Sequence, residues 1–96
     1  MKVFFSSESE IDLESIADEI AKDSPRRAVT YMQEIVETCL SLRDQPRRFP
    51  VIAPLGNELR RVVHGRYLIF YVIRPDHVRI ARIIHSARLI DAALFI

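Results

Sequence analysis

Cysteine, lysine and long apolar runs are scarce in this sequence, and each scarcity excludes a class of protein. Cys39 is the single cysteine, which excludes a disulfide within the chain. No segment approaches the roughly 18 uninterrupted apolar residues of a membrane helix, and the opening MKVFFSSESE becomes acidic too early for a secretory signal. The chain of 96 residues has room for one domain, residues 1–96. We therefore expect a single-domain cytoplasmic protein that does not bind membranes.

Lysine occurs only at Lys2 and Lys22, so the positive charge of the chain comes almost entirely from arginine. Residues 1–45 hold ten acidic and five basic side chains, whereas residues 46–96 hold nine arginines and three acids. Arginine favours bidentate pairing with carboxylate or phosphate over diffuse attraction. The arginines of the second half can therefore pair with the acidic first half or with an anionic partner, and the sequence leaves both open.

Two helices are predicted in the acidic half. Ser7 and Glu10 have the spacing of a capping box, and apolar residues then recur at helical intervals over residues 8–22. Ser24 is placed as the N-cap of a second helix, residues 25–43, whose first position is a proline. The connection is so short that the two helices must form an antiparallel hairpin.

The rest of the chain has the pattern of strands and loops. KVFF, residues 2–5, is a short first strand, and the prolines of residues 45–57 break any helix there. Three strands follow, ELRRVV, RYLIFYVI and VRIARIIHS, with turns at His64-Gly65 and Pro75-Asp76. The apolar tail ARLIDAALFI is expected to pack on the chain's own sheet. The predicted fold is α+β, with an N-terminal strand and an antiparallel helical hairpin on one face of a small antiparallel β-sheet.

Counting along the strands predicts which side chains share a face of this sheet. A two-residue turn at Pro75-Asp76 places Arg66 opposite His85, whereas a three-residue loop would place Tyr67 there. The two-residue register gives one face with Arg61, Arg66, Arg79 and His85 and the other with Arg60, Arg82, Tyr67, Ile69, Tyr71, Ile73 and Ile84. Because the helices cover only one face, the first group would form an open, positive surface suited to a phosphate backbone or an acidic protein segment.

Several stretches, in order along the chain, carry a resemblance to a known family. They are FSSESEIDLESIADEIA, LRDQPRRFP, LRRVVHGRYLIFYVI and above all RIARIIHSAR, with its hydrophobic–His–x–Ala–Arg ending. Together they resemble the ParE branch of the RelE/ParE toxin superfamily of bacterial type II toxin–antitoxin systems. The resemblance covers essentially the whole chain.

The resemblance implies a toxin that inhibits DNA gyrase and blocks replication without chemistry or a cofactor of its own. It also implies a ParD-like antitoxin, whose disordered C-terminal segment folds onto the toxin to give a hetero-oligomer. The groove that meets the target or the antitoxin would use Arg61, Arg66, Arg79, His85 and Arg88.

The alternative within the superfamily is a RelE-like mRNA endonuclease that acts in the ribosome and uses Arg66 and His85. Such cleavage needs a base, an acid and a cation beside the phosphate. The acids of the second half, Glu58, Asp76 and Asp91, are not expected near His85, and the lysine cluster and late tyrosine of some nucleases are missing, with Ser86 at the latter place. A structural hydrogen bond at the strand end is the competing role for His85.

The residues also bear on two other classes of function, a metal site and a nucleic-acid-binding module. A metal site is not expected, because His64, His77 and His85 are dispersed and Cys39 belongs to the apolar stripe of a helix, where a buried structural thiol is predicted. A simple nucleic-acid-binding module remains an alternative because of the arginines, although stacking aromatics interleaved with them are missing.

Overall fold

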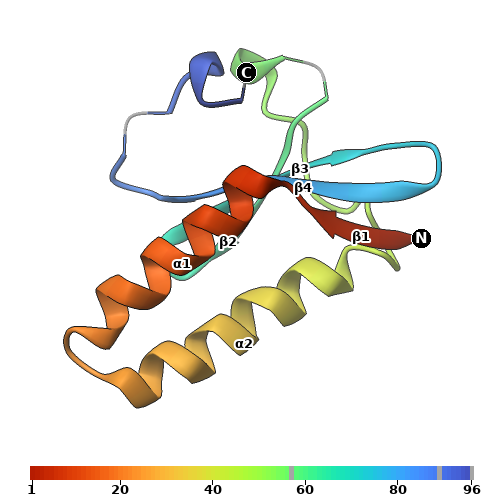
Figure 1. Cartoon of the computed structure of the whole chain (residues 1–96). Coiled ribbons are helices and arrows are strands. Elements are labelled where there is room, and N and C mark those ends of the chain that lie inside the picture. The colour runs from red at the N-terminus through yellow and green to blue at the C-terminus, as the bar shows by residue number, and fades with distance from the viewer. Residues whose placement is uncertain (57, 89, 96) are drawn as a thin grey trace.

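The computed structural model describes residues 1–56, 58–88 and 90–95, with two helices and four strands (Figure 1). The elements in chain order are β1 Lys2–Phe5, α1 Ser7–Ala21, α2 Pro25–Ser41, β2 Arg60–His64, β3 Tyr67–Ile73 and β4 His77–His85. Short 3₁₀ turns lie at Ala53–Leu55 and Ala92–Phe95. No helix in the described part of the chain has both the length and the apolar character to cross a bilayer.

The helical hairpin forms as predicted, with one correction at its start. Ser24 caps α2, and its side chain accepts a hydrogen bond from the Arg27 N–H at 3.1 Å. The cap of α1 is Ser6 and not Ser7, because β1 ends at Phe5 and the Ser6 side chain accepts from the Ser9 N–H at 3.0 Å. Helix α2 ends two residues earlier than expected.

The sheet has the strand order β1-β4-β3-β2. Strands β2, β3 and β4 pair antiparallel, whereas β1 pairs parallel with β4. The α+β class with a helical hairpin on one face is confirmed, but the sheet is mixed and not wholly antiparallel. The parallel pairing follows from the connection, because the chain passes through both helices and two strands before it returns beside β1.

Two register predictions were wrong. The turn between β2 and β3 is Gly65-Arg66, since His64 pairs with Tyr67. Between β3 and β4, the two-residue turn at Pro75-Asp76 is confirmed, and its register holds as far as the pair Tyr71–Ile80. A bulge at Ala81 then shifts the register, so that His85 faces Tyr67 and not Arg66.

The bulge has a visible partner in the first strand. Strand β1 ends at Phe5, and the next residue, Ser6, donates its hydroxyl proton to the Ala81 carbonyl at 2.7 Å. The Ser6 N–H donates to the Ile80 carbonyl at 2.9 Å. The carbonyl that the bulge removes from the ladder is therefore satisfied. The bulge also moves Arg82 and Ile84 to the face opposite the one predicted.

Both faces of the sheet are covered. On the helix face, a core cluster includes Ile16, Ile35, Cys39, Leu42, Val62, Ile69, Tyr71, Val78, Ile80 and Ile83. On the other, which we call the tail face, a second cluster of Leu59, Leu68, Phe70, Val72, Ala81 and Ile84 is packed by Ile52, Leu55, Ile90, Leu94 and Phe95. Figure 1 shows the C-terminal turn (blue) beside Ala53–Leu55 (green), away from the helices.

The expectation of an open positive face was therefore wrong, whereas the expectation that the apolar tail packs on the sheet is confirmed for Ile90, Leu94 and Phe95. Leu89 and Ile96 of the tail, and Asn57 of the proline loop, lie outside the described residues.

Candidate functional site

A groove of about 870 Å³ runs between the helical hairpin and the end of the β2–β3–β4 sheet. We call it the hairpin groove. Its walls are Asp12, Ser15, Ile16, Glu19 and Ile20 of α1, Arg27 and Tyr31 of α2, Gly65, Arg66 and Tyr67 at the β2–β3 turn, and Ile83, Ile84, His85 and Arg88 at the end of β4. The groove combines an apolar floor with charged groups of both signs, which suits a folded segment of a partner protein.

Three of the five predicted site residues, Arg66, His85 and Arg88, meet at one end of this groove. Backbone hydrogen bonds hold them together: the Ser86 N–H donates to the Arg66 carbonyl at 2.8 Å, and the Arg88 N–H donates to the His85 carbonyl at 3.0 Å. The side chains of Arg66 and Arg88 are exposed, and no ion pair to either is formed within residues 1–56, 58–88 and 90–95. Two exposed guanidinium groups therefore face solvent at this end, available to an anionic partner.

The other two predicted site residues lie elsewhere. Arg61 is paired opposite Phe70 and Arg79 opposite Val72, and both partners belong to the tail-face cluster. The structure therefore does not bring Arg61 and Arg79 into the hairpin groove. The reason is the register, which gives the helix face to His85 while these two arginines stay on the tail face.

The His85 ring has a defined orientation at the strand end. Its Nδ1 atom accepts a hydrogen bond from the Ala87 N–H at 3.0 Å. The ring also stands edge-on to Tyr67, with 5.2 Å between centroids and an interplanar angle of 84°. Because Nδ1 is an acceptor, the neutral ring has its proton on Nε2, which is then the group available to a partner.

The acidic side chains of the groove are engaged within the chain. Asp12 accepts from Arg82 Nε at 2.8 Å and Nη2 at 2.9 Å, and from the Ile83 N–H at 2.9 Å. Glu19 accepts from Lys22 at 3.0 Å. The hydrogen bonds that Arg82 donates to Asp12 raise the pKa of Arg82 above its already high ordinary value, so this guanidinium stays charged.

The Asp12–Arg82 pair is a contact that sequence reasoning missed. Of the two partners left open for the arginines of residues 46–96, Arg82 thus has the acidic first half of the chain. The two residues are 70 positions apart and are joined only because β1 stops at Phe5, which leaves the far end of β4 open to α1. No local signal in the sequence marks this pair.

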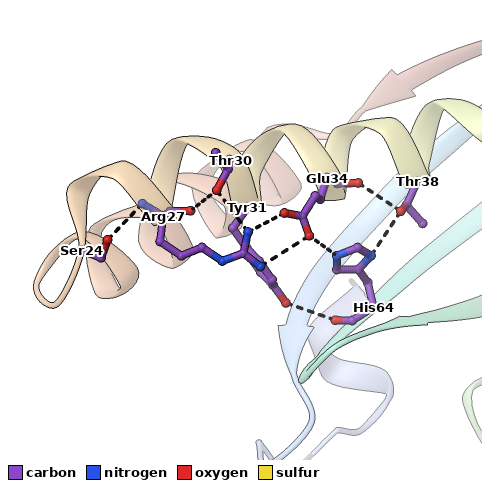
Figure 2. Close-up of polar contacts among 7 residues, drawn as sticks. All are labelled: Ser24, Arg27, Thr30, Tyr31, Glu34, Thr38 and His64. Atoms are coloured by element: carbon purple, nitrogen blue, oxygen red, sulfur yellow. Dashed lines mark hydrogen bonds and ion pairs between the residues drawn. The ribbon is translucent and has the colours of Figure 1, made fainter.

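A polar network lines α2 beside the groove (Figure 2). Arg27 donates to Glu34, and this hydrogen bond lowers the pKa of the Glu34 carboxyl. Thr38 donates its hydroxyl proton to the Glu34 carbonyl at 3.0 Å, and its oxygen lies 3.2 Å from Nδ1 of His64. Since a hydroxyl has one proton, His64 donates from Nδ1 to Thr38. The Tyr31 hydroxyl donates to the His64 carbonyl at 3.4 Å.

The residues that could hold a metal ion are dispersed. Within the described residues, no group of three His, Cys, Asp or Glu side chains is placed to bind one. His77 lies at the far end of β4 from His85, paired with Asp76 at 2.8 Å. The Cys39 thiol is buried, as predicted, and burial raises its pKa to about 12, so it is protonated at neutral pH.

Comparisons with known proteins agree with this architecture. Residues 3–90 match the family model described as the ParE toxin of the type II toxin–antitoxin system parDE. A solved structure of the chromosomal ParDE toxin–antitoxin system from P. aeruginosa superposes with a TM-score of 0.76 and 20% sequence identity, over 88% of this chain and 95% of that chain. At this identity the superposition supports the fold, and no curated protein matches the sequence closely enough to count as a relative. Because the family match spans nearly the whole sequence, the chain belongs to the ParE toxin family of type II toxin–antitoxin systems.

Proposed function

We propose that this ParE toxin inhibits DNA gyrase and thereby blocks replication, as a single domain of residues 1–96 that acts in the cytoplasm without a cofactor. A ParD-like antitoxin neutralises it by binding as part of a hetero-oligomer. In this proposal Arg66, His85 and Arg88 of the hairpin groove contact the target or the antitoxin. Arg61 and Arg79 supply a separate contact from the tail face.

The observation that carries the proposal is the hydrogen bond from the Ala87 N–H to Nδ1 of His85. A general acid in RNA cleavage must carry a proton to give to the leaving oxygen, and an imidazolium has protons on both nitrogens. Protonation of Nδ1 would set two N–H groups against each other and break this bond. The geometry therefore favours a histidine that orders the strand end and donates from Nε2, which is a binding role.

The engagement of the acids supports the same conclusion. A nuclease would need a carboxylate free to accept the 2′-hydroxyl proton. In the groove, Asp12 already accepts three hydrogen bonds and Glu19 accepts one from Lys22. Neither is positioned as a free base.

The antitoxin contact fits the composition of the groove. Exposed Arg66 and Arg88 lie at one end, and the groove is lined along its length by Ile16, Ile20, Tyr67 and Ile83. An amphipathic acidic helix has the complementary pattern, with apolar residues on one side and carboxylates on the other. Folding of a disordered antitoxin segment in this groove would also cover the surface that we assign to the target.

The experiment that tests the target is pulse labelling within minutes of inducing the toxin alone. We expect thymidine incorporation to stop while methionine incorporation continues. Purified toxin should also block supercoiling of relaxed plasmid by purified gyrase, and the double variant R66A/R88A should lose most of this inhibition. The matched control is the double variant R43A/R47A, which removes two exposed arginines that line neither the groove nor the tail-face contact; equal losses in the two double variants would contradict the assignment to the groove.

One observation favours the RelE-like nuclease as a second candidate, namely that Arg66 and His85 do line the same groove. In that case methionine incorporation would stop first, and ribosome-bound mRNA would be cut. His85→Gln would then abolish cleavage, whereas a binding role for Nε2–H would be partly retained by the glutamine amide.

A further inference from the structure

The β2–β3 turn is the element that presents Arg66 to the hairpin groove, and helix α2 contacts it through Tyr31. We propose that Tyr31 is a positioning residue: it fixes this turn against α2 and thereby sets where Arg66 and the end of β4 lie. The inference rests on the proposed function for the role of Arg66 and His85 in binding. The positioning of the turn by Tyr31 concerns the toxin alone.

Tyr31 contacts the residues on both sides of the turn. Its hydroxyl donates to the His64 carbonyl at 3.4 Å. Its ring stands edge-on to His64 at 5.5 Å and to Tyr67 at 5.9 Å between centroids. The Arg27 guanidinium lies over the ring, 5.0 Å from its centroid, which restricts the ring from the outer side (Figure 2).

Gly65 and Tyr31 fit each other closely. Gly65 has a φ of +58°, a backbone angle that residues with a side chain rarely adopt. A Cβ built at this position would also lie 2.6 Å from the Tyr31 hydroxyl oxygen but 3.8 Å from the ring carbon Cζ. The hydroxyl therefore occupies the space that any side chain at position 65 would need. Because residue 65 is glycine, the turn can pack directly against the Tyr31 hydroxyl.

The same face of α2 holds the strand end at one further point. Tyr31 and Thr38 lie on one stripe along the helix. The Thr38 hydroxyl oxygen accepts a hydrogen bond from Nδ1 of His64 at 3.2 Å. The residue before the turn is thus fixed through both its side chain and its carbonyl, and Gly65 in the turn faces the Tyr31 hydroxyl.

The position of the turn also affects the end of β4, where His85 and Arg88 lie. The Arg66 carbonyl accepts from the Ser86 N–H at 2.8 Å, directly after His85. A shift of the turn away from α2 would therefore break or carry along the end of β4. Tyr31 thus acts on Arg66 and His85 through the backbone.

A double-mutant cycle on Tyr31 and Gly65 tests the proposal. Gly65→Ala introduces the clash with the hydroxyl as well as backbone strain, and the double variant G65A/Y31F keeps the strain but removes the clash. By hydrogen exchange of the amides of residues 64, 67 and 86, we expect G65A to raise exchange by at least about tenfold. Y31F alone should raise it by a smaller factor, because it removes the hydrogen bond to the His64 carbonyl but keeps the ring contacts. In the G65A background Y31F should restore part of the protection. If the effects of the two substitutions on exchange simply add, so that the amides of G65A/Y31F exchange as fast as those of G65A or faster, the proposal is overturned.

Two further variants keep the test decisive if G65A does not fold. Tyr31→Leu removes the hydroxyl and the ring edge and should raise exchange in the turn by about tenfold, while the amides of β1 stay unchanged. Val29→Ala, on the exposed side of the same helix, is the matched control and should leave the turn unchanged. Unchanged exchange in Tyr31→Leu would refute the positioning role.

Supercoiling by purified gyrase separates the two proposals. If the positioning and the target are both right, gyrase inhibition follows the exchange cycle, with G65A weakened by about tenfold or more and partly rescued by Y31F. If wild-type toxin does not inhibit gyrase, the target assignment fails, while the exchange cycle still decides whether Tyr31 positions the turn. If the exchange cycle behaves as expected but inhibition in G65A is intact, Arg66 does not need this position and the functional part of the inference is wrong.

Discussion

The two faces of the sheet are buried by different means. The helix face is covered by α1 and α2, and Ile69 and Ile80 on it, like Ile35 of α2, have no solvent exposure. The tail face has a buried centre at Phe70, but Leu59 and Leu68 at its border remain 8% and 9% exposed. Two helices of about four turns each cover the helix face, whereas the tail face is covered by a four-residue 3₁₀ turn and the loop with Ile52 and Leu55, which leave slightly more exposure.

The cover of the tail face is also connected to the helical hairpin. A single 3₁₀ turn has little stability of its own. It is held by Phe95 against Phe70, with 5.0 Å between ring centroids, and by the hydrogen bond from Arg82 Nη1 to the Leu94 carbonyl at 3.0 Å. Because Arg82 also binds Asp12 of α1, the tail is connected to the helical hairpin through one arginine.

The largest expected effect comes from breaking that connection with Arg82→Ala. The Asp12 side chain is 11% exposed, so the substitution leaves a nearly buried carboxylate without its counter-charge. We expect a loss of about 3 to 5 kcal/mol in the free energy of unfolding, measured by urea denaturation, together with faster hydrogen exchange at residues 90–95.

Two variants control this measurement. Lys22→Ala breaks an ion pair with Glu19 of similar length, 3.0 Å against 2.8 Å, in which both side chains are exposed, and it should leave the denaturation midpoint unchanged within error. The double variant D12A/R82A should be less destabilised than the sum of the single variants, because it leaves no unpaired charge. An additive cycle would show that the tail and α1 are not coupled through this pair.

A second experiment compares the two faces within one strand. Ile80 lies on the helix face and Ile84 on the tail face of β4, with 0% and 2% exposure. Truncation to alanine should cost about 4 kcal/mol at Ile80 and about 2 kcal/mol at Ile84, because the tail can move into the hole and the helices cannot. Equal losses, measured with equal denaturant m-values, would mean that the tail is as rigid a cover as the helices.

Local signals in the sequence predicted the helix face well. The apolar periodicity of α1 and α2, the Ser24 cap and the glycine of the first hairpin turn are all features of short segments, and each appears in the structure. The Ser7 cap failed by one residue because two adjacent serines offer the same chemistry. The choice of Ser6 is made by β4, through hydrogen bonds to Ile80 and Ala81 that no local pattern contains.

The candidate site was predicted only in part, and one residue explains most of the error. Ala81 forms a bulge without the glycine that often marks one, so counting by twos along β4 gave the wrong face for Arg82 and His85. The structure therefore groups Arg66, His85 and Arg88 in the groove without Arg61 and Arg79, and the binding role of all five stays a prediction. Asp12 was missed for a related reason, since its contact with Arg82 is fixed by strand lengths and not by spacing.

The pH dependence of stability probes how completely the helix face excludes water. Burial raises the pKa of the Cys39 thiol from 9.0 to about 12, so the folded protein keeps a proton that the unfolded chain releases above pH 9. Stability therefore falls as pH rises from 9 to 12, by about 1.4 kcal/mol between pH 8 and pH 10. Cys39→Ala should lack this decrease when urea denaturation is repeated at both pH values under reducing conditions.

The control in this experiment is the slope and not the absolute stability, because Cys39→Ala also removes packing. Burial raises the pKa of Tyr31 and Tyr71 as well, so both proteins should share a further loss above pH 10. Parallel curves for wild type and Cys39→Ala between pH 8 and pH 10 would show that water reaches the thiol.

The smallest effect is expected where the tail cover is thinnest, at Phe95→Ala. The substitution removes an edge-on aromatic contact with Phe70 from a residue that is only partly buried, and we expect a loss of about 1 kcal/mol. Phe4 is the matched control, since it makes a similar edge-on contact with His77 at 5.2 Å but is 52% exposed, and its truncation should cost less.

Substitutions on the two faces should also differ in dye binding. Loss of Phe95 uncovers Phe70 and should increase binding of the dye ANS in native buffer. Ile80→Ala should leave native dye binding unchanged, because α1 and α2 still cover its face. Equal dye binding by Phe95→Ala and wild type would mean that the proline loop alone protects the tail face.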